Sequence, residues 1–359
     1  MLASLPVAGR QHRRMHNKLW LADNAVGIVG GRNLGDEYYS AGSPRNFADL
    51  DLLVMGPVMA PLSRSFDLYW NHGLAQPIGR YRQADPDAWR VLRNRLAAWL
   101  EARSDSTYFA ALRERYENRS RSRLADSLHW GEAEALWDPP GKPARRGRPP
   151  LAETMAGQLV RRLAPESRLL LVSAYFVPTS AGSRRLQAMA EAGIEVTVVT
   201  NSLEASDVPL VHGAYAPYRA GLLESGVALF ELRGDLAADG DPHDERVGSS
   251  GSVLHIKALG VDRDRLFVGS ANADPRSVWW NTEVGVLAVS EPLLDDFMAF
   301  VAEGASPQQS YALELDVRGR LHWLTLIDGR PVHLDREPGS AGARLLAWLS
   351  GLLGLEPWL

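Results

Sequence analysis

The amino-acid sequence predicts an α/β protein arranged as a pseudo-twofold repeat of two mixed β-sheet halves flanked by helices. Two observations carry this prediction. A string of six residues occurs twice with the same spacing, in residues 16–33 and again in residues 255–272. Residues 151–254 alternate apolar strand-like runs with amphipathic helical stretches, an order typical of a parallel or mixed sheet covered by helices.

The repeated string has a spacing that chance rarely produces. Two copies agree in position at all six residues, and only one position exchanges glycine for serine. The residues are His16, Lys18, Asp23, Gly30, Gly31 and Asn33 in the first copy and His255, Lys257, Asp262, Gly269, Ser270 and Asn272 in the second.

Each copy predicts a β-hairpin that carries a phosphate site. Side chains two apart on a strand share a face, so the histidine and lysine of each copy stand side by side and can hold one phosphate. Asp23-Asn24 and residues 262–264 are typical turn sequences, and apolar runs follow them as returning strands. The small residues after each hairpin let the backbone approach an anion, with amide N–H groups and an asparagine as donors.

The paired H-x-K-x4-D motifs resemble the signature of the phospholipase D superfamily. Four further segments are similar to bacterial cardiolipin synthases of the C type: VGGRNLGDEYY from residue 29, FADLDLLVMGPV from residue 47, WDPPGKP from residue 137, and residues 198–232. The resemblance implies a phospholipase D-like fold. It also implies an enzyme that transfers a phosphatidyl group between phospholipids through a phosphohistidine intermediate, with no cofactor and no metal.

The resemblance also assigns roles to residues. The catalytic set is His16, Lys18, Asp23, His255, Lys257 and Asp262, and the supporting set is Asn33, Ser270, Asn272, Asp49 and Glu283. The lysines and asparagines are expected to neutralise the phosphate, and Asp49 and Glu283 to hydrogen-bond the catalytic imidazoles. The resemblance favours His16 as nucleophile and His255 as general acid, and the reverse assignment stays open.

Four further residues have expected roles outside the reaction at phosphorus itself. Asp23 and Asp262 are expected to brace the hairpins and their lysines rather than to react. Ser270 is expected to donate to the phosphate. His212 begins a helix and is either a packing residue or a substrate contact.

Two other functions remain open at this point. With water as acceptor, the same histidines would make a phospholipase D-type phosphodiesterase that hydrolyses lipids or nucleic acid. The formal net charge of −4 makes a nucleic-acid substrate unfavourable. The third alternative is an inactive truncated remnant, because only 15 residues precede His16 whereas 104 residues separate residue 150 from His255. We therefore expect the first half to lack its leading strand–helix–strand portion.

The expected organisation has four parts. Residues 1–138 form the truncated first half with a helical insertion, and residues 139–150 form a linker rich in proline, glycine and arginine. Residues 151–303 form the second half, and residues 304–359 form a hairpin and an amphipathic helix.

The expected partners are phospholipids, namely phosphatidylglycerol and possibly phosphatidylethanolamine, at the bacterial inner membrane. The chain has no apolar run of about 18 residues, so contact with the membrane would be peripheral. The terminal helix from residue 341 would either lie in the membrane interface or pack on the domain. A basic run from Arg113 to Arg123 would be either a solvated helix face or a contact for anionic headgroups.

Overall fold

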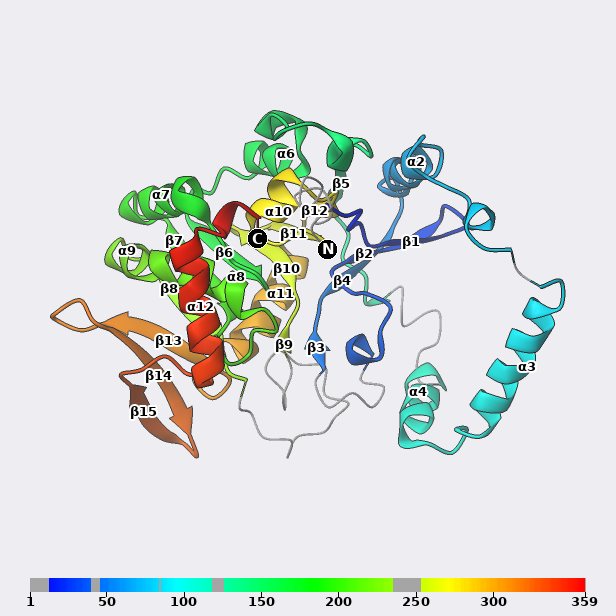
Figure 1. The fold of residues 1–359 in the computed structure, drawn as a ribbon. Helices are drawn as coiled ribbons and strands as arrows, with labels where there is room; N and C mark the ends of the chain where they lie inside the picture. Colours follow the sequence, from blue (N-terminus) through cyan, green and yellow to red (C-terminus); the bar gives the residue numbers. More distant parts are fainter. Residues whose placement is uncertain (1–12, 40–45, 84, 118–125, 235–252, 359) are drawn as a thin grey trace. The chain divides into compact units, whose positions relative to one another are not determined.

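The computed structural model describes residues 13–39, 46–83, 85–117, 126–234 and 253–358 (Figure 1). The chain divides into two compact units. One comprises residues 1–67 and 131–359, and the other comprises residues 68–130. The first unit holds both repeated motifs, and the two units are described separately.

A ten-stranded mixed sheet forms the centre of the first unit (Figure 1). β6, β7 and β8 are parallel, and all other neighbours in the sheet are antiparallel. The strand order is β15-β14-β13-β8-β7-β6-β10-β11-β12-β5. The predicted α/β class with a mixed sheet is therefore confirmed. The bounds are β5 Glu132–Trp137, β6 Arg168–Ser173, β7 Glu195–Asn201, β8 Ala228–Leu232, β10 Lys257–Val261, β11 Arg265–Gly269, β12 Val284–Val289, β13 Ser310–Leu315, β14 Leu321–Ile327 and β15 Arg330–Leu334.

Helices link the parallel strands because parallel pairing requires a crossover connection. α7 connects β6 to β7, and α8 and α9 connect β7 to β8. β6 is buried on both faces: Leu169 and Leu171 pack into one apolar cluster, while Leu170 and Val172 pack into another. This explains why its sequence is a continuous apolar run. The helices are α6 Met155–Arg162, α7 Thr179–Glu191, α8 Pro209–Tyr215, α9 Arg219–Glu224, α10 Pro275–Trp279 and α11 Glu291–Gly304.

The first half contributes a much smaller sheet. β1 (Leu19–Ala22), β2 (Val26–Gly30) and β4 (Asp51–Met55) are antiparallel throughout. The expectation of a mixed sheet in this half was wrong, because these three strands are joined without the helical crossover that parallel pairing needs. The short β3 (Phe47–Ala48) pairs instead with β9 (Val253–Leu254) of the second half, in parallel.

Both repeated motifs form the predicted hairpins, β1–β2 and β10–β11. Asp23 and Asn24 have φ of 53°, and Asp262 has φ of 54°. Asp and Asn tolerate this left-handed backbone better than most residues, which is why they occur at these turns. In each half an antiparallel third strand follows, β4 beside β2 and β12 beside β11.

The region between the halves is more ordered than a linker. β5 lies within residues 1–138 but pairs with β12 at the edge of the large sheet. Lys142, expected in the linker, is 2% exposed and donates to Asp138 Oδ2 at 2.9 Å and to the Ser277 carbonyl at 2.9 Å. Residues 138–142 are therefore anchored to the second half.

The C-terminal region extends the large sheet and ends in α12 (Ala341–Leu353). β13 and β14 form the predicted hairpin, β15 adds a third strand, and β13 pairs with β8. α12 packs on α8, where Ser350 Oγ donates to the Leu210 carbonyl at 2.6 Å. A Cβ on Gly213 would lie 2.1 Å from the Ala347 carbonyl oxygen, so glycine is what permits this close approach.

The second unit contains α3 (Ala88–Glu101) and α4 (Thr107–Glu117). Arg113 is exposed and donates to the Ser104 carbonyl. The other arginines of the expected basic run lie beyond what the structure describes, in whole or at the side chain. Among the described residues, no helix is both long and apolar enough to cross a membrane.

Candidate active site

His16 lies against a carboxylate of the other half. Its Nδ1 is 2.9 Å from Glu283 Oε2 and 3.2 Å from Oε1. Glu283 is completely buried, and its Oε2 also accepts a hydrogen bond from the Ser270 hydroxyl. An ionised Glu283 accepts the N–H at Nδ1, which leaves Nε2 of His16 for chemistry. The proton position is inferred from this bonding.

His255 of the second half lies against a carboxylate of the first half, Asp49. Its Nδ1 is 2.6 Å from Oδ2 of Asp49, whose side chain is buried and whose Oδ1 accepts from the Leu50 amide. Lys257 Nζ is 3.1 Å from the same Nδ1. One nitrogen cannot donate to the carboxylate and accept from the lysine, and the shorter contact to an anion favours donation to Asp49.

The backbone repeats the same geometry around both histidines. His16 N donates to the Thr282 carbonyl at 3.0 Å, and His255 N donates to the Ala48 carbonyl at 2.8 Å. In each case the carbonyl belongs to the residue just before the orienting carboxylate. Short parallel pairing between the halves, Met15 with Thr282 and β3 with β9, sets both alignments. Each half thus supplies one histidine and the carboxylate for the other histidine.

The two lysines lie beside their histidines, Lys257 buried and Lys18 half-buried. Lys18 Nζ donates to the His16 carbonyl at 2.9 Å, and Lys257 Nζ donates to the His255 carbonyl. Burial lowers the pKa of Lys18 to about 8; Glu283 opposes this effect and the charge of Lys257 adds to it. Burial also lowers the pKa of Lys257, against the opposing effect of Asp49 and Glu283. Removal of both ammonium groups from water thus disfavours their charged forms, and a bound anion would stabilise those forms again.

His255 is also affected by both lysines. Burial lowers its pKa to about 4, and the charges of Lys257 and Lys18 add to this effect, while Asp49 opposes it. Because the charges of the two motifs act on each other, the two halves form one electrostatic site.

The sequence prediction did not identify Tyr38. Its hydroxyl lies 3.4 Å from His255 Nε2 and accepts from Asn33 Nδ2 at 2.7 Å. Its ring stacks on Phe47 with centroids 4.8 Å apart, and burial raises its pKa to about 12. Asn33 thus contacts Tyr38, and its expected contact with the phosphate stays a prediction. A tyrosine nine residues before Phe47 carries no spacing signal that would have revealed this contact.

The two copies differ where Ser270 replaces Gly31. The Ser270 hydroxyl is engaged with Glu283 and also accepts from the Val284 amide at 3.1 Å, so it orients the carboxylate rather than facing a phosphate. At Gly31 a Cβ would lie 2.4 Å from Asp49 Oδ1. A serine at position 31 would therefore clash with Asp49. Glycine is the residue that allows Asp49 to lie this close to the backbone of the first motif.

Asn272 lies where the sequence predicted a phosphate ligand. It is buried, and its Oδ1 makes no hydrogen bond with the part of the chain that the structure describes. Its backbone N donates to Ser277 Oγ at 3.2 Å. This oxygen is an acceptor, so only the Nδ2 group of Asn272 could donate to a phosphate, and its role as a phosphate ligand stays a prediction.

The two aspartates of the motifs lie away from the histidines. Asp262 follows the far end of β10, roughly 16 Å from the lysine by strand geometry. Its Oδ1 accepts from the amides of residues 166–168, and these bonds hold its pKa at about 2. Asp23 is an exposed turn residue. Asp262 braces the end of its hairpin, whereas the bracing role of Asp23 stays a prediction; among the described residues, no hydrogen bond or ion pair joins either aspartate to its lysine.

His212 belongs to a separate buried cluster. Its Nε2 is 2.7 Å from Glu337 Oε1, and Arg219 Nη2 donates to the same oxygen at 2.5 Å. His212, Glu231 and Glu337 are placed as a metal triad would be. However, the Arg219 guanidinium also lies 2.8 Å from Glu231 and supplies the positive charge there. This cluster joins α8 and α9 to the C-terminal region, which favours the packing role for His212.

Comparison with known proteins identifies relatives of the chain. Residues 159–303 match a family profile described as "Cardiolipin synthase, PLD-like domain". The chain is 34% identical over 361 residues to cardiolipin synthase C of Escherichia coli (strain K12), covering 98% of this chain and 74% of that protein. It is 28% identical to an uncharacterized protein of Helicobacter pylori (strain ATCC 700392 / 26695), covering 92% of this chain and 64% of that one.

The fold is also found in a solved structure. Phosphatidylserine synthase of Haemophilus influenzae Rd KW20 superposes with a TM-score of 0.56 at 13% identity, covering 85% of this chain and 64% of that one. This similarity supports the fold, and the relationship in sequence supports the family. The chain belongs to the cardiolipin synthase family of phospholipase D-like enzymes.

Proposed function

We propose that the protein is a phosphatidyltransferase of the cardiolipin synthase type, acting on phosphatidylglycerol and possibly phosphatidylethanolamine. The observation that carries this proposal is the reciprocal arrangement of His16 with Glu283 and His255 with Asp49. Two oriented imidazoles, each with a lysine beside it, fit a two-step displacement at a phosphodiester. The relationship to cardiolipin synthase C supports a lipid as the substrate.

In the proposed reaction Lys18 and Lys257 neutralise the phosphodiester, and Nδ2 of Asn272 donates a hydrogen bond to it. Nε2 of His16 attacks phosphorus, and the bond from phosphorus to the headgroup oxygen breaks. His255 gives its Nε2 proton to that oxygen. His255 then takes the proton of the acceptor hydroxyl, which attacks phosphorus and releases His16. Glu283 and Asp49 stabilise the imidazolium form of each histidine in turn.

One observation favours the reverse assignment of the histidines. A pKa of about 4 keeps His255 neutral in the empty site, as a nucleophile requires. With His16 as nucleophile, the bound phosphate anion must first raise the pKa of His255. Trapping distinguishes the two cases: quenching a reaction with lipid labelled in the phosphate should leave label on the His255→Asn chain if His16 attacks, and on the His16→Asn chain if His255 attacks.

We also propose peripheral contact with the inner membrane through α12. Its packed side is made of small residues, Ala347 and Ser350, whereas Trp348 is 62% exposed. Leu345, Leu352 and Leu353 are exposed as well. A helix that turns leucine and tryptophan away from the domain suits a membrane interface, where such side chains leave water.

A transfer assay tests the function. Mixed liposomes with labelled phosphatidylglycerol and phosphatidylethanolamine are incubated with the protein, with His16→Asn and with His255→Asn, in the presence of chelator. Formation of cardiolipin that either substitution abolishes supports the proposal. Release of phosphatidic acid identifies a hydrolase. No turnover of lipid, with cleavage of single-stranded DNA instead, would refute the lipid assignment.

A further inference from the structure

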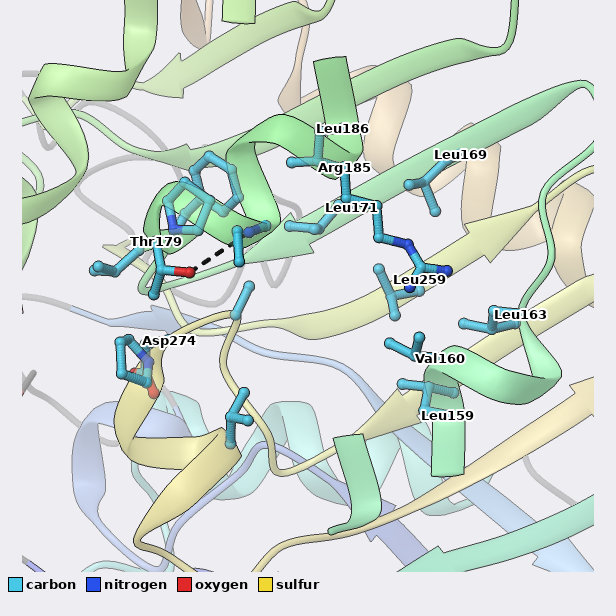
Figure 2. A pocket seen from close by; sticks show the side chains of 18 of the residues that line it. Leu159, Val160, Leu163, Leu169, Leu171, Thr179, Arg185, Leu186, Leu259 and Asp274 are labelled. Carbon is cyan, nitrogen blue, oxygen red and sulfur yellow. Dashed lines mark hydrogen bonds between the residues drawn. The ribbon is translucent and has the colours of Figure 1, made fainter. Parts of the chain in front are cut away.

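Two apolar cavities adjoin on one face of the large sheet. The larger has a volume of about 450 Å³ and lies among α6, α7, α10 and the strands β6 and β10 (Figure 2). The smaller has a volume of about 160 Å³ and includes Lys257 and Asn272 in its lining. Six residues line both: Leu159, Val160, Leu171, Leu259, Ala273 and Val278. The cavities therefore adjoin, and we call the two together the apolar path; its lining extends from Lys257 and Asn272 to Trp279.

The register of β10 and β6 explains this path. Lys257 pairs with Ser173, and Leu259 pairs with Leu171. Side chains two apart share a face, so Lys257 and Leu259 point to the same side of the sheet, about 7 Å apart along the strand. The side chain that follows the catalytic lysine on this face thus already belongs to the cavity wall. A ligand whose phosphate lies at Lys257 has an apolar space directly beside it.

The polar groups of the larger cavity are few. Asp274 accepts from the Ser277 amide at 2.6 Å as the N-cap of α10, and the Thr179 hydroxyl accepts from the Gly182 amide at 3.5 Å, as drawn in Figure 2. Arg185 is exposed and also lines the cavity, and Figure 2 draws its side chain among the lining leucines. The rest of the lining is aliphatic, aromatic or glycine. A polar ligand such as a nucleotide or a second headgroup would lose its hydrogen bonds with water there.

The size of the larger cavity fits a hydrocarbon chain. It lies within the usual range of roughly 300–1,000 Å³ for ligand pockets. At about 30 Å³ for each water-sized group, it holds about fifteen such groups, on the order of one long acyl chain. Val160 and Leu151 line it and are partly exposed, so the rim through which a chain enters is apolar too.

We propose that this path binds one acyl chain of the phospholipid whose phosphate reacts at the two histidines. The proposal deepens the proposed function and depends on it for the identity of the ligand. It makes α6, α7 and α10 the part of the protein that distinguishes a diacyl phosphodiester from a water-soluble one, and it places acyl-chain specificity in the second half.

A filled cavity tests the proposal. Gly182 lines the cavity, and a Cβ there would have only the Pro178 Cβ within 4 Å, at 3.7 Å. Gly182→Trp places a large side chain in or across the cavity, and Gly182→Ala is the matched control with the same backbone change. Val160→Trp is a second filling variant at a partly exposed site. Thermal melting identifies any variant that does not fold.

Two readouts separate this proposal from the proposed function. The first is binding, measured in the His16→Asn chain so that no lipid is turned over. Phosphatidylglycerol with a doxyl-labelled acyl chain quenches the fluorescence of nearby tryptophans. The quenching is compared with and without Trp279→Phe, because Trp279 lines the cavity. The second is turnover of dihexanoyl and dioctanoyl phosphatidylglycerol below their micellar concentrations, beside a soluble aryl phosphodiester.

The expected results follow from burial of methylene groups. Two additional methylenes should tighten binding roughly fifteenfold in the unfilled chain and by less than threefold in Gly182→Trp. Turnover of the soluble diester should be unchanged. Gly182→Trp with undiminished dependence on chain length, or quenching that Trp279→Phe does not reduce, would overturn the proposal. If Trp279→Phe reduces the quenching but the unsubstituted chain does not turn over any lipid, the acyl site is retained and the transferase function is rejected.

Discussion

The two orienting carboxylates give the clearest predictions for single residues. Glu283→Gln and Asp49→Asn keep the shape of each side chain but remove the negative charge that stabilises the imidazolium, and the new NH2 group can face Nδ1 in place of an acceptor. We expect each to lower kcat by about a hundredfold to ten-thousandfold with little change in KM. Steady-state kinetics on lipid substrate measures this, and Glu314→Gln, at an exposed position outside the site, is the control. A wild-type kcat in either variant would reject the pairing.

His255 makes the stability of the fold depend on pH. Its pKa falls from an ordinary 6.5 to about 4 in the folded chain because it is buried. Between these values the unfolded chain binds a proton that the folded chain does not, so acid favours unfolding. This contribution is complete above pH 6.5 and is lost as the pH falls toward 4.

Urea unfolding measures this dependence. We expect the free energy of unfolding to decrease by roughly 2 kcal/mol from pH 7 to pH 5 because of His255. The His255→Asn chain should show a correspondingly weaker dependence on pH. Equal slopes for the two chains would mean that His255 titrates normally.

At the scale of elements, substitutions in α12 test membrane binding independently of catalysis. Burying a leucine or tryptophan contributes about 1.5–3 kcal/mol, so Trp348→Ser and Leu352→Ser should each weaken vesicle binding by roughly tenfold or more. Both side chains are exposed, so the fold should be unaffected. Sedimentation with phosphatidylglycerol vesicles measures the effect. Val317→Ser removes another exposed apolar side chain outside α12 and should leave vesicle binding unchanged.

The elements also show what the sequence could and could not predict. Both hairpins were predictable because spacing, turn residues and apolar runs are local signals. The position of β5 was not, because pairing with β12 depends on contacts more than 140 residues away in sequence. Lys142 looked like part of a linker because its neighbours are proline, glycine and arginine. Its burial depends on Asp138 and on a carbonyl of α10, which no local pattern reveals.

The sequence predicted most residues of the site but not how these residues are arranged. The repeat identified both histidines, and the resemblance to the phospholipase D superfamily identified Asp49 and Glu283. The repeat could not show that each carboxylate belongs to the other half's histidine, because two copies of one string carry no information on how they meet. Tyr38 and the acyl path were not predicted either, since both depend on side chains gathered by tertiary packing.

At the scale of the whole molecule, the exchange of carboxylates makes the two halves mutually dependent. A chain with Asp49→Asn retains an intact second half, and a chain with Glu283→Gln retains an intact first half. If two such inactive chains swap halves when they refold together, the intact halves meet and form one undamaged site. Mixed refolding should then recover up to about a quarter of the activity, whereas mixing the two folded proteins should recover none. Complementation between two alleles that encode these inactive variants would thus measure how readily the two halves separate and exchange between chains.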